Sequence, residues 1–191
     1  RIELLRRFDF DHTRMTMSVV VRLPDGRIFC YCKGAPEKLS VRCDPRSMPA
    51  DYAAQASEHA MNGCYVLSLA CKELQEVPTQ GASAVRDQLE CELRFVSLLL
   101  FRNELKDSSA AAIASLKTGD VRPVMVTGDN AQCGYYIARK CSLLSPGSRV
   151  LLAKTQKSDA ERLVEWREMG VAGACSLSTE QVEGLMLAGA E

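Results

Sequence analysis

The sequence lacks several features that would assign it to a common class. Its longest run of large apolar residues is Leu98–Phe101, far short of the ~18 residues of a membrane span. It has only two His, and its nine Cys show no paired CxxC spacing, so we interpret them as reduced thiols of a cytosolic compartment. Lys+Arg and Asp+Glu are equal at 24 each, which argues against a nucleic-acid binder. A small ligand or a protein partner is expected instead.

The chain also lacks an opening Met and an apolar signal segment, which we interpret as the mark of a piece of a longer protein. Hydrophobic residues make up 47% of it, enough for a core in one large domain or two small ones. Charge is uneven, because residues 1–46 hold ten Lys/Arg against six Asp/Glu, while residues 156–191 hold three against seven. The basic end is where an anion would be drawn.

The first part of the chain has the pattern of an antiparallel sheet with helices. Two β-rich runs flank a Pro-Asp-Gly turn, which predicts a hairpin, and a helical stretch that Gly63 ends is followed by another strand. A stretch rich in Pro, Gly, Ser and Thr then predicts a linker or surface loop. The predicted elements are strands at Thr16–Leu23, Arg27–Lys33 and Tyr65–Lys72, a helix at Pro49–Met61 and the loop at Glu76–Ala84.

The second part alternates strands and helices. Leu93–Phe101 is a nearly continuous apolar run, typical of a buried parallel strand, and a βαβ unit follows from it. Pro123 favours a start at Val124 for the next strand. The predicted elements are a helix capped by Asp107 and running to Lys117, a strand at Val121–Thr127, a helix at Asn130–Cys141, a strand at Ser148–Ala153, a helix at Ser158–Met169 with a Ser158-x-x-Glu161 capping box, and a weak strand and helix in 171–191.

Two strand ends carry residues suited to an anionic ligand. Thr127-Gly128-Asp129 lies at the carboxyl end of a predicted strand, where open α/β sheets bind ligands, although the same triplet also makes an ordinary strand-to-helix turn. Lys33 ends a strand ahead of Gly34-Ala35-Pro36-Glu37, and its point charge suits a nucleotide. A lone Lys there is more often a solvated surface charge, so a second signal is needed.

The segment Phe10–Val19, read together with Lys33-Gly34-Ala35-Pro36-Glu37, supplies that signal, because the pair resembles the nucleotide-binding domain of P-type ATPases. Three further pieces follow in the family's order. They are Gly63–Ala70, which resembles the GxRVLALA strand, Asn103–Lys106, which resembles the signature entering the phosphorylation domain, and Met125–Asn130, which reads MVTGDN. The resemblance covers about residues 5–145.

The sequence Asn103–Lys106, which reads NELK, stands where the calcium and sodium pumps have DPPR. With Leu98–Phe101 before it, this form is most similar to the type V branch and, within it, to the lysosomal, polyamine-transporting subgroup. The resemblance implies that the chain lies on the cytosolic face of an endolysosomal membrane. Its partners would be the membrane and actuator domains of the parent pump.

The resemblance also implies an ATP site. An aromatic ring would stack on adenine between apolar walls. A lysine in the pocket would supply positive charge, and a glycine beside it would keep the approach open. A second set of residues would contact the phosphates. Without the lysine motif, Phe10 and Met17 are better interpreted as core residues. The implied nucleotide-binding residues are Phe10 on the base, Met17 and Leu67 as walls, Lys33 and Gly34, then Lys106, Thr127, Gly128 and Asp129 on the phosphate side.

Departures from the family pattern limit the expected chemistry. The sequence contains neither DKTGT, which carries the phosphorylated aspartate, nor GDGxND, which holds Mg²⁺, so this chain alone is expected to bind ATP without hydrolysing it. The Mg²⁺ site would be completed by residues outside it. Tyr65 stands where the family has Arg, which removes a cation. Two alternatives remain: a non-catalytic nucleotide-binding or interaction module, and a haloacid dehalogenase-like phosphatase using Asp9-Phe10-Asp11.

The expected fold class is α/β. Residues 1–91 would be the C-terminal portion of an α+β nucleotide-binding domain with an antiparallel sheet, and residues 92–191 a portion of a Rossmann-like, haloacid dehalogenase-type phosphorylation domain. A parallel sheet without its first strand leaves an open apolar edge, which favours self-association.

Overall fold

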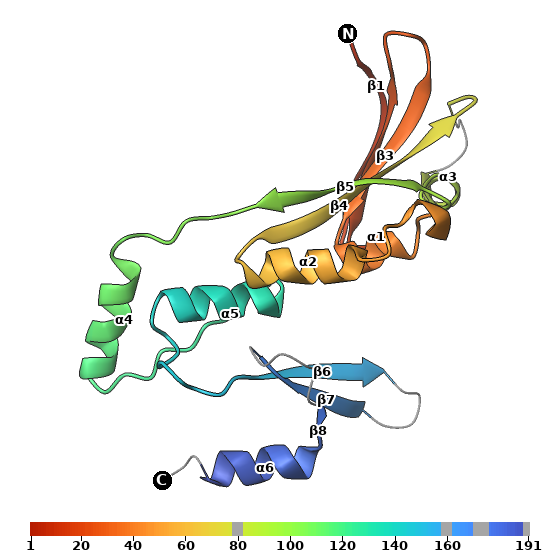
Figure 1. Ribbon diagram of the computed structural model, residues 1–191. Helices are drawn as coiled ribbons and strands as arrows, with labels where there is room; N and C mark the ends of the chain where they lie inside the picture. Colours follow the sequence, from red (N-terminus) through yellow and green to blue (C-terminus); the bar gives the residue numbers. More distant parts are fainter. Residues whose placement is uncertain (78–81, 158–161, 170–175, 189–191) are drawn as a thin grey trace.

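The chain is organised around a five-stranded antiparallel sheet (Figure 1). A computed structural model describes residues 1–77, 82–157, 162–169 and 176–188. Strand order in the sheet follows the sequence, and each strand runs antiparallel to its neighbour. The strands are β1 (Glu3–Asp11), β2 (Thr16–Arg22), β3 (Ile28–Gly34), β4 (Tyr65–Leu74) and β5 (Arg94–Phe101). The mixed α/β class and the antiparallel sheet of the first part are therefore confirmed.

The predicted hairpin is the β2–β3 pair. Its turn is closed by hydrogen bonds from Leu23 N to Arg27 O at 2.8 Å and from Gly26 N to Leu23 O at 3.0 Å. Beyond the turn, β2 and β3 pair without a register shift from Arg22 opposite Ile28 to Thr16 opposite Gly34. This unbroken ladder determines which side chains share each face, because successive residues of a strand point to opposite faces.

Helices cover one face of the sheet. On that face Val20 and Cys30 pack with Val85 and Leu89 of α3, and Cys32 and Ala70 pack with Leu39 of α1. All of these residues are fully or almost fully buried, and Cys30 and Leu39 are 0% exposed. The helices are α1 (Pro36–Ser40), α2 (Tyr52–Met61) and α3 (Ala82–Leu89), and a short 3-10 turn spans Pro45–Ser47.

α3 corrects one expectation. The loop predicted over 76–84 ends before Ala82, where α3 begins, and residues 78–81 lie outside the described part of the chain. Val85 and Leu89 stand four residues apart and pack on the sheet, so burial of one helix face outweighs the loop-forming composition.

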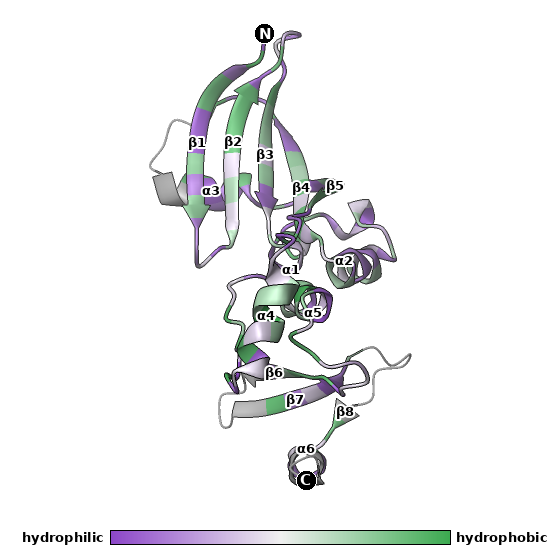
Figure 2. Ribbon diagram, turned by 90° about the vertical axis from the view of Figure 1, so that its left-hand side faces the viewer, coloured by the Kyte–Doolittle hydropathy of each residue, from purple (hydrophilic) through white to green (hydrophobic). Residues whose placement is uncertain are grey.

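The second part of the chain lies beyond α2 and away from the upper end of the sheet (Figure 2). α5 contacts α2, where Gln132 Nε2 donates to Ser57 Oγ at 2.7 Å. The helix predicted at Asn130–Cys141 forms as α5, and the Asn130 side chain caps it by accepting a hydrogen bond from Gln132 N, a cap that the sequence analysis did not predict. The predicted cap at Asp107 is wrong: Ser108 precedes the helix and makes no side-chain cap. The elements are α4 (Ser109–Thr118), α5 (Ala131–Lys140), β6 (Leu151–Lys157), β7 (Arg162–Glu168), β8 (Ser176–Leu177) and α6 (Thr179–Ala188).

The parallel strand pairing expected after residue 92 is not formed by the described residues. β5 joins the first sheet and runs antiparallel to β4. Residues 121–127 make no strand, and Val124 and Val126 are 75% and 93% exposed. A parallel ladder requires an adjacent strand of the same direction, and the described residues place none beside this segment. The sequence predicts that the apolar run of β5 is buried on both faces of a sheet. Val96 and Leu100 are instead exposed although they are apolar, so burial does not account for the whole run.

The helix predicted at Ser158–Met169 is also wrong over the part that is described. β7 pairs antiparallel with β6 and with β8 instead. Arg149 holds the end of β7 through two hydrogen bonds to Glu168, each 2.8 Å. Val164 and Trp166 are strand-forming residue types, which explains the outcome. The proposed capping box at Ser158 and Glu161 lies outside the described residues.

Candidate nucleotide site on the open sheet face

The face of the sheet opposite the helices carries three of the residues predicted to bind nucleotide. Met17 on β2 lies directly opposite Lys33 on β3, and Lys33 lies opposite Leu69 on β4. Leu67 follows on the same face of β4, two residues from Leu69. Lys33 is exposed, and the apolar residues around it are half-buried. The ladder therefore sets one cation among apolar side chains, which suits a base with an attached anionic group.

Phe10 joins this face through an irregularity in the β1–β2 pairing. The register passes from Phe8 opposite Ser18 to Asp11 opposite Thr16, so Asp9 and Phe10 together face the single residue Met17. Such a bulge redirects a side chain relative to a regular strand. Phe10 is 48% exposed, and its ring makes an edge contact with His12, with ring centroids 5.0 Å apart. An accessible aromatic face is available to a base.

The turn that follows Phe10 is fixed by its own side chains. Asp11 Oδ1 accepts hydrogen bonds from Thr13 N at 2.8 Å and Arg14 N at 2.9 Å. These donors, the Arg14 N–H above all, lower the pKa of Asp11 below its ordinary value. Met15 then adopts a left-handed φ of 54° and leads directly into β2. The aspartate is thus a turn residue in this structure, ionised at neutral pH.

Gly34 allows a close backbone contact within the sheet. A Cβ at this position would lie 2.5 Å from Met15 O and 2.7 Å from the Thr16 side chain. Gly34 is buried on the helix-covered side, opposite Thr16 and Ser68. Its lack of a side chain lets β3 approach the turn before β2, and Ala35 N donates to Met15 O there at 3.1 Å.

The residues predicted for the phosphate side lie apart from this face. Thr127, Gly128 and Asp129 are exposed in the turn before α5, where Asp129 N donates to Thr127 Oγ1 at 3.0 Å. Thr127 also lines a largely apolar cavity of about 560 Å³ together with Val124. Lys106 is exposed ahead of α4. Within the described ranges, no hydrogen bond or ion pair joins these residues to Phe10, Met17 or Lys33.

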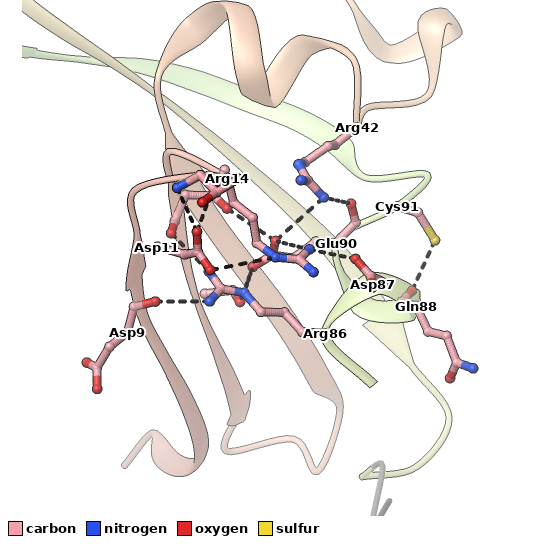
Figure 3. A network of polar contacts seen from close by, with 12 residues as sticks. Asp9, Asp11, Arg14, Arg42, Arg86, Asp87, Gln88, Glu90 and Cys91 are labelled. Carbon is pink, nitrogen blue, oxygen red and sulfur yellow. Dashed lines mark hydrogen bonds and ion pairs between the residues drawn. The ribbon is translucent and has the colours of Figure 1, made fainter. Parts of the chain in front are cut away.

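Beneath the open face lies a polar network that the sequence analysis missed (Figure 3). Glu90 is fully buried and accepts from Arg86 Nε at 2.7 Å and from Ser18 Oγ at 2.7 Å. The Arg86–Glu90 spacing of four residues, beside the apolar pair Val85 and Leu89, is the signal that could have revealed both the helix and the pair. A cavity of about 880 Å³, bordered by Arg14 and Arg42, opens next to Glu90.

The cysteines of the sheet behave as core residues. Cys30 and Cys32 point to the same helix-covered face, as expected from their spacing, and both are 0% exposed. Burial raises the pKa of Cys30 to about 12 and raises the pKa of Cys32 as well, so both thiols are neutral at physiological pH. All eight cysteines in the described part of the chain are free thiols.

The described residues do not supply a complete cation site. They contain no cluster of three potential His, Cys, Asp or Glu ligands. Asp129 alone in its turn does not match the several oxygen ligands that Mg²⁺ takes from carboxylates and phosphates. None of the described helices has the length and apolar character needed to cross a bilayer.

Comparison with known proteins bears on this site. The family model for the P-type ATPase cytoplasmic domain N matches residues 1–108. The chain is 35% identical over 154 residues to the polyamine-transporting ATPase 13A2 of Homo sapiens, covering 79% of this chain and 13% of that protein. It is 31% identical over 183 residues to the polyamine-transporting ATPase 13A3 of Mus musculus, covering 93% and 15%. For the probable cation-transporting ATPase catp-6 of Caenorhabditis elegans, identity is 32% over 155 residues, covering 79% and 12%. The chain thus spans less than a sixth of the length of these relatives.

Proposed function

Because the chain belongs to the P-type ATPase family, its first 108 residues matching the cytoplasmic domain N, we propose that the open face of its sheet binds the adenine end of ATP. Phe10 stacks on the base, Met17 and Leu67 contact its edges, and the Lys33 ammonium meets the negative charge of the nucleotide. Gly34 contributes by letting β3 approach the turn that follows Phe10.

The observation that carries this proposal is the convergence on one face. Phe10 and Met17 oppose one another across the β1–β2 bulge, and Met17 opposes Lys33 across the β2–β3 ladder. Three strands thus present an accessible ring, a half-buried thioether and an exposed cation side by side. Stacking and dispersion suit a purine, and a single Lys adds charge without fixing one geometry.

The rest of the proposal concerns the parent protein. Lys106, Thr127, Gly128 and Asp129 would meet the phosphate end and Mg²⁺ only when the missing parts of the pump are present. The whole protein would couple ATP hydrolysis, through an aspartyl-phosphate, to transport of a cation, with polyamine as the cargo favoured by the names of two relatives. We place it at the cytosolic face of an endolysosomal membrane, with the membrane and actuator domains as partners. The chain alone would not turn over ATP.

We also propose that the chain contains parts of two domains. The sheet extends through β5 to Phe101, so we place the change from the nucleotide-binding domain to the phosphorylation domain after this residue rather than at residues 91 and 92. The segment Asn103–Lys106 would then lie in the connection between the two.

Calorimetric titration of the full 191-residue chain with ATP, ADP and GTP tests the nucleotide site. We expect dissociation constants between tens of micromolar and millimolar, or roughly 4 to 6 kcal/mol. Phe10→Ala should remove the preference for adenine, and Lys33→Ala should weaken ATP and GTP together. Leu116→Ala and Lys154→Ala are controls, because both residues are exposed and lie outside the five-stranded sheet.

The outcomes separate the candidates. Adenine-selective binding that disappears in Phe10→Ala supports the proposed site. A well-folded chain that binds no nucleotide, with circular dichroism unchanged, contradicts it and favours the non-catalytic interaction module, in which Tyr65 has replaced the cation the family usually supplies. Phosphatase activity towards a generic phosphate ester would instead favour the haloacid dehalogenase-like alternative.

A further inference from the structure

Arg86 and Glu90 make a buried ion pair directly below the strands that carry Phe10 and Met17. Arg86 Nε donates to Glu90 Oε1 at 2.7 Å, and the two residues are 9% and 0% exposed. Glu90 also accepts from Ser18 Oγ at 2.7 Å and from Thr16 Oγ1 at 3.2 Å. The carboxylate therefore has the partners that a buried charge needs.

The remaining nitrogens of Arg86 reach the backbone of two strands. Nη1 donates to the carbonyl of Asp9 at 3.1 Å, and Nη2 donates to the carbonyl of Thr16 at 2.9 Å. Figure 3 shows the contact between Arg86 and the Asp9 carbonyl as a dashed line. Asp9 immediately precedes Phe10, and Thr16 immediately precedes Met17. Because each peptide unit is planar, fixing a carbonyl also fixes the plane of the following residue's N–H.

One of these carbonyls, that of Asp9, lies where the β1–β2 ladder is interrupted, and the other, that of Thr16, belongs to the residue that resumes the pairing opposite Asp11. The bulge between Phe8 and Asp11 interrupts the β1–β2 ladder at Asp9 and Phe10. A planar guanidinium with five donors can bridge the gap, binding one carboxylate and two carbonyls at once. An apolar pair of similar size would fill the same space without reaching either carbonyl, so packing alone does not account for this arrangement.

We propose that Arg86, oriented by Glu90, is a positioning residue for adenine recognition, fixing the backbone on which Phe10 and Met17 stand. This inference rests on the proposed nucleotide function. It assigns Arg86 no contact with the nucleotide. Its effect passes through the Asp9 and Thr16 carbonyls, and it therefore concerns the base more than the phosphates.

Arg86→Lys and Arg42→Lys form a matched pair for the test. Both retain a cation beside Glu90, since Arg42 Nη1 lies 3.7 Å from Glu90 Oε2. Only the Arg86 substitution removes the planar fork that joins the two strand carbonyls, because one ammonium cannot span all three acceptors. Titration of the full chain with ATP and with GTP separates base recognition from phosphate binding.

We expect Arg86→Lys to weaken ATP binding about tenfold, the equivalent of one hydrogen bond to a charged group, while GTP binding changes less than about twofold. Arg42→Lys should leave both affinities within about twofold of the unmodified chain. Equal losses for ATP and GTP, or an ATP affinity unchanged in Arg86→Lys, would overturn the inference. If the unmodified chain binds no ATP, or if Phe10→Ala binds it normally, the proposed function itself fails.

A second measurement needs no variant to fold. In the isotope-labelled chain, saturation with ATP should shift the NMR signals of the Arg86 guanidinium together with the amides of Phe10 and Met17. The Arg42 guanidinium should stay unchanged. An Arg86 signal that does not move while the Phe10 amide does would contradict a positioning role.

Discussion

The sheet region, residues 1–101, and the region after it differ in how completely their apolar residues are covered. In the sheet region Val20, Leu39 and Leu93 are 0% exposed. After residue 101, Val124 and Val126 are 75% and 93% exposed, although they belong to a segment with strand-like composition. Local signals have taken effect in both regions, as the hairpin turn at Asp25-Gly26 and the cap at Asn130 show. The difference teaches that a strand sequence becomes a strand only where neighbouring chain is present to pair with it.

The largest effect that would test this contrast comes from the same substitution made in each region. Leu93→Ala opens a cavity in the sheet core and should lower the free energy of unfolding by about 2–5 kcal/mol. Leu116→Ala removes a side chain that is 45% exposed on α4 and should cost no more than about 0.5 kcal/mol. Urea unfolding followed by circular dichroism measures both. Equal costs would show that the two regions form one core.

The joint between the regions gives an intermediate effect. Gly63 has a φ of 80°, and a Cβ there would overlap the Tyr136 ring of α5. Gly63→Ala should therefore destabilise the chain by about 1–3 kcal/mol. Gly119→Ala is the control, because Gly119 has a φ of −81° and a Cβ would meet nothing closer than 3.5 Å.

Tyr136→Ala, combined with Gly63→Ala in a double-mutant cycle, separates the two causes. Removing the ring should recover the part of the loss that comes from overlap and leave the part that comes from φ. Strictly additive effects in thermal unfolding would mean that α5 does not rest on Gly63.

The smallest effect distinguishes two carboxylates by their sensitivity to pH and salt. The pKa of Asp11 is lowered chiefly by the Arg14 N–H, and the pKa of Glu168 is lowered chiefly by the Arg149 side chain. Each contribution to stability is present above the ordinary pKa values of 3.8 and 4.5, and each is lost as pH falls through the lowered value.

High salt should separate them, since it screens an exposed ion pair more than a hydrogen bond to the backbone. The screening length falls roughly threefold between 0.1 and 1 M NaCl. In NMR titrations of the side-chain carboxyls at these two salt concentrations, the Glu168 pKa should therefore rise with salt, whereas the Asp11 pKa should stay low. A rise of the same size at both sites would indicate that Arg14 acts on Asp11 through its charge.

The sequence was most informative where structure depends on nearby residues. The Asp25-Gly26 hairpin and the helix that begins after Asn130 follow from turn chemistry and local sequence pattern, and both formed as predicted. The antiparallel class of the sheet was predicted from the hairpin pattern, whereas Met17 and Lys33 were grouped only by the family resemblance; the register of the two paired strands sets them on one face.

Other features depend on contacts between distant segments and left little trace in the sequence. Glu90 reads as a surface charge, yet Ser18, from a strand more than seventy residues away, satisfies it in the core. The bulge that sets Phe10 opposite Met17 depends on the pairing of two strands and has no composition of its own. Residues 121–127 carry strand-forming types, but their partner is not among the described residues.

The close approach at Gly34 makes one mechanical unit of two segments that lie far apart in the sequence. Ala35 N is bonded to Met15 O, and Gly34 leaves no space between β3 and that carbonyl. Shortening or lengthening the turn at 11–15 would therefore displace the lysine segment as well. A change of length in one segment is therefore expected to be tolerated only together with a compensating change in the other, because the two segments share this backbone contact.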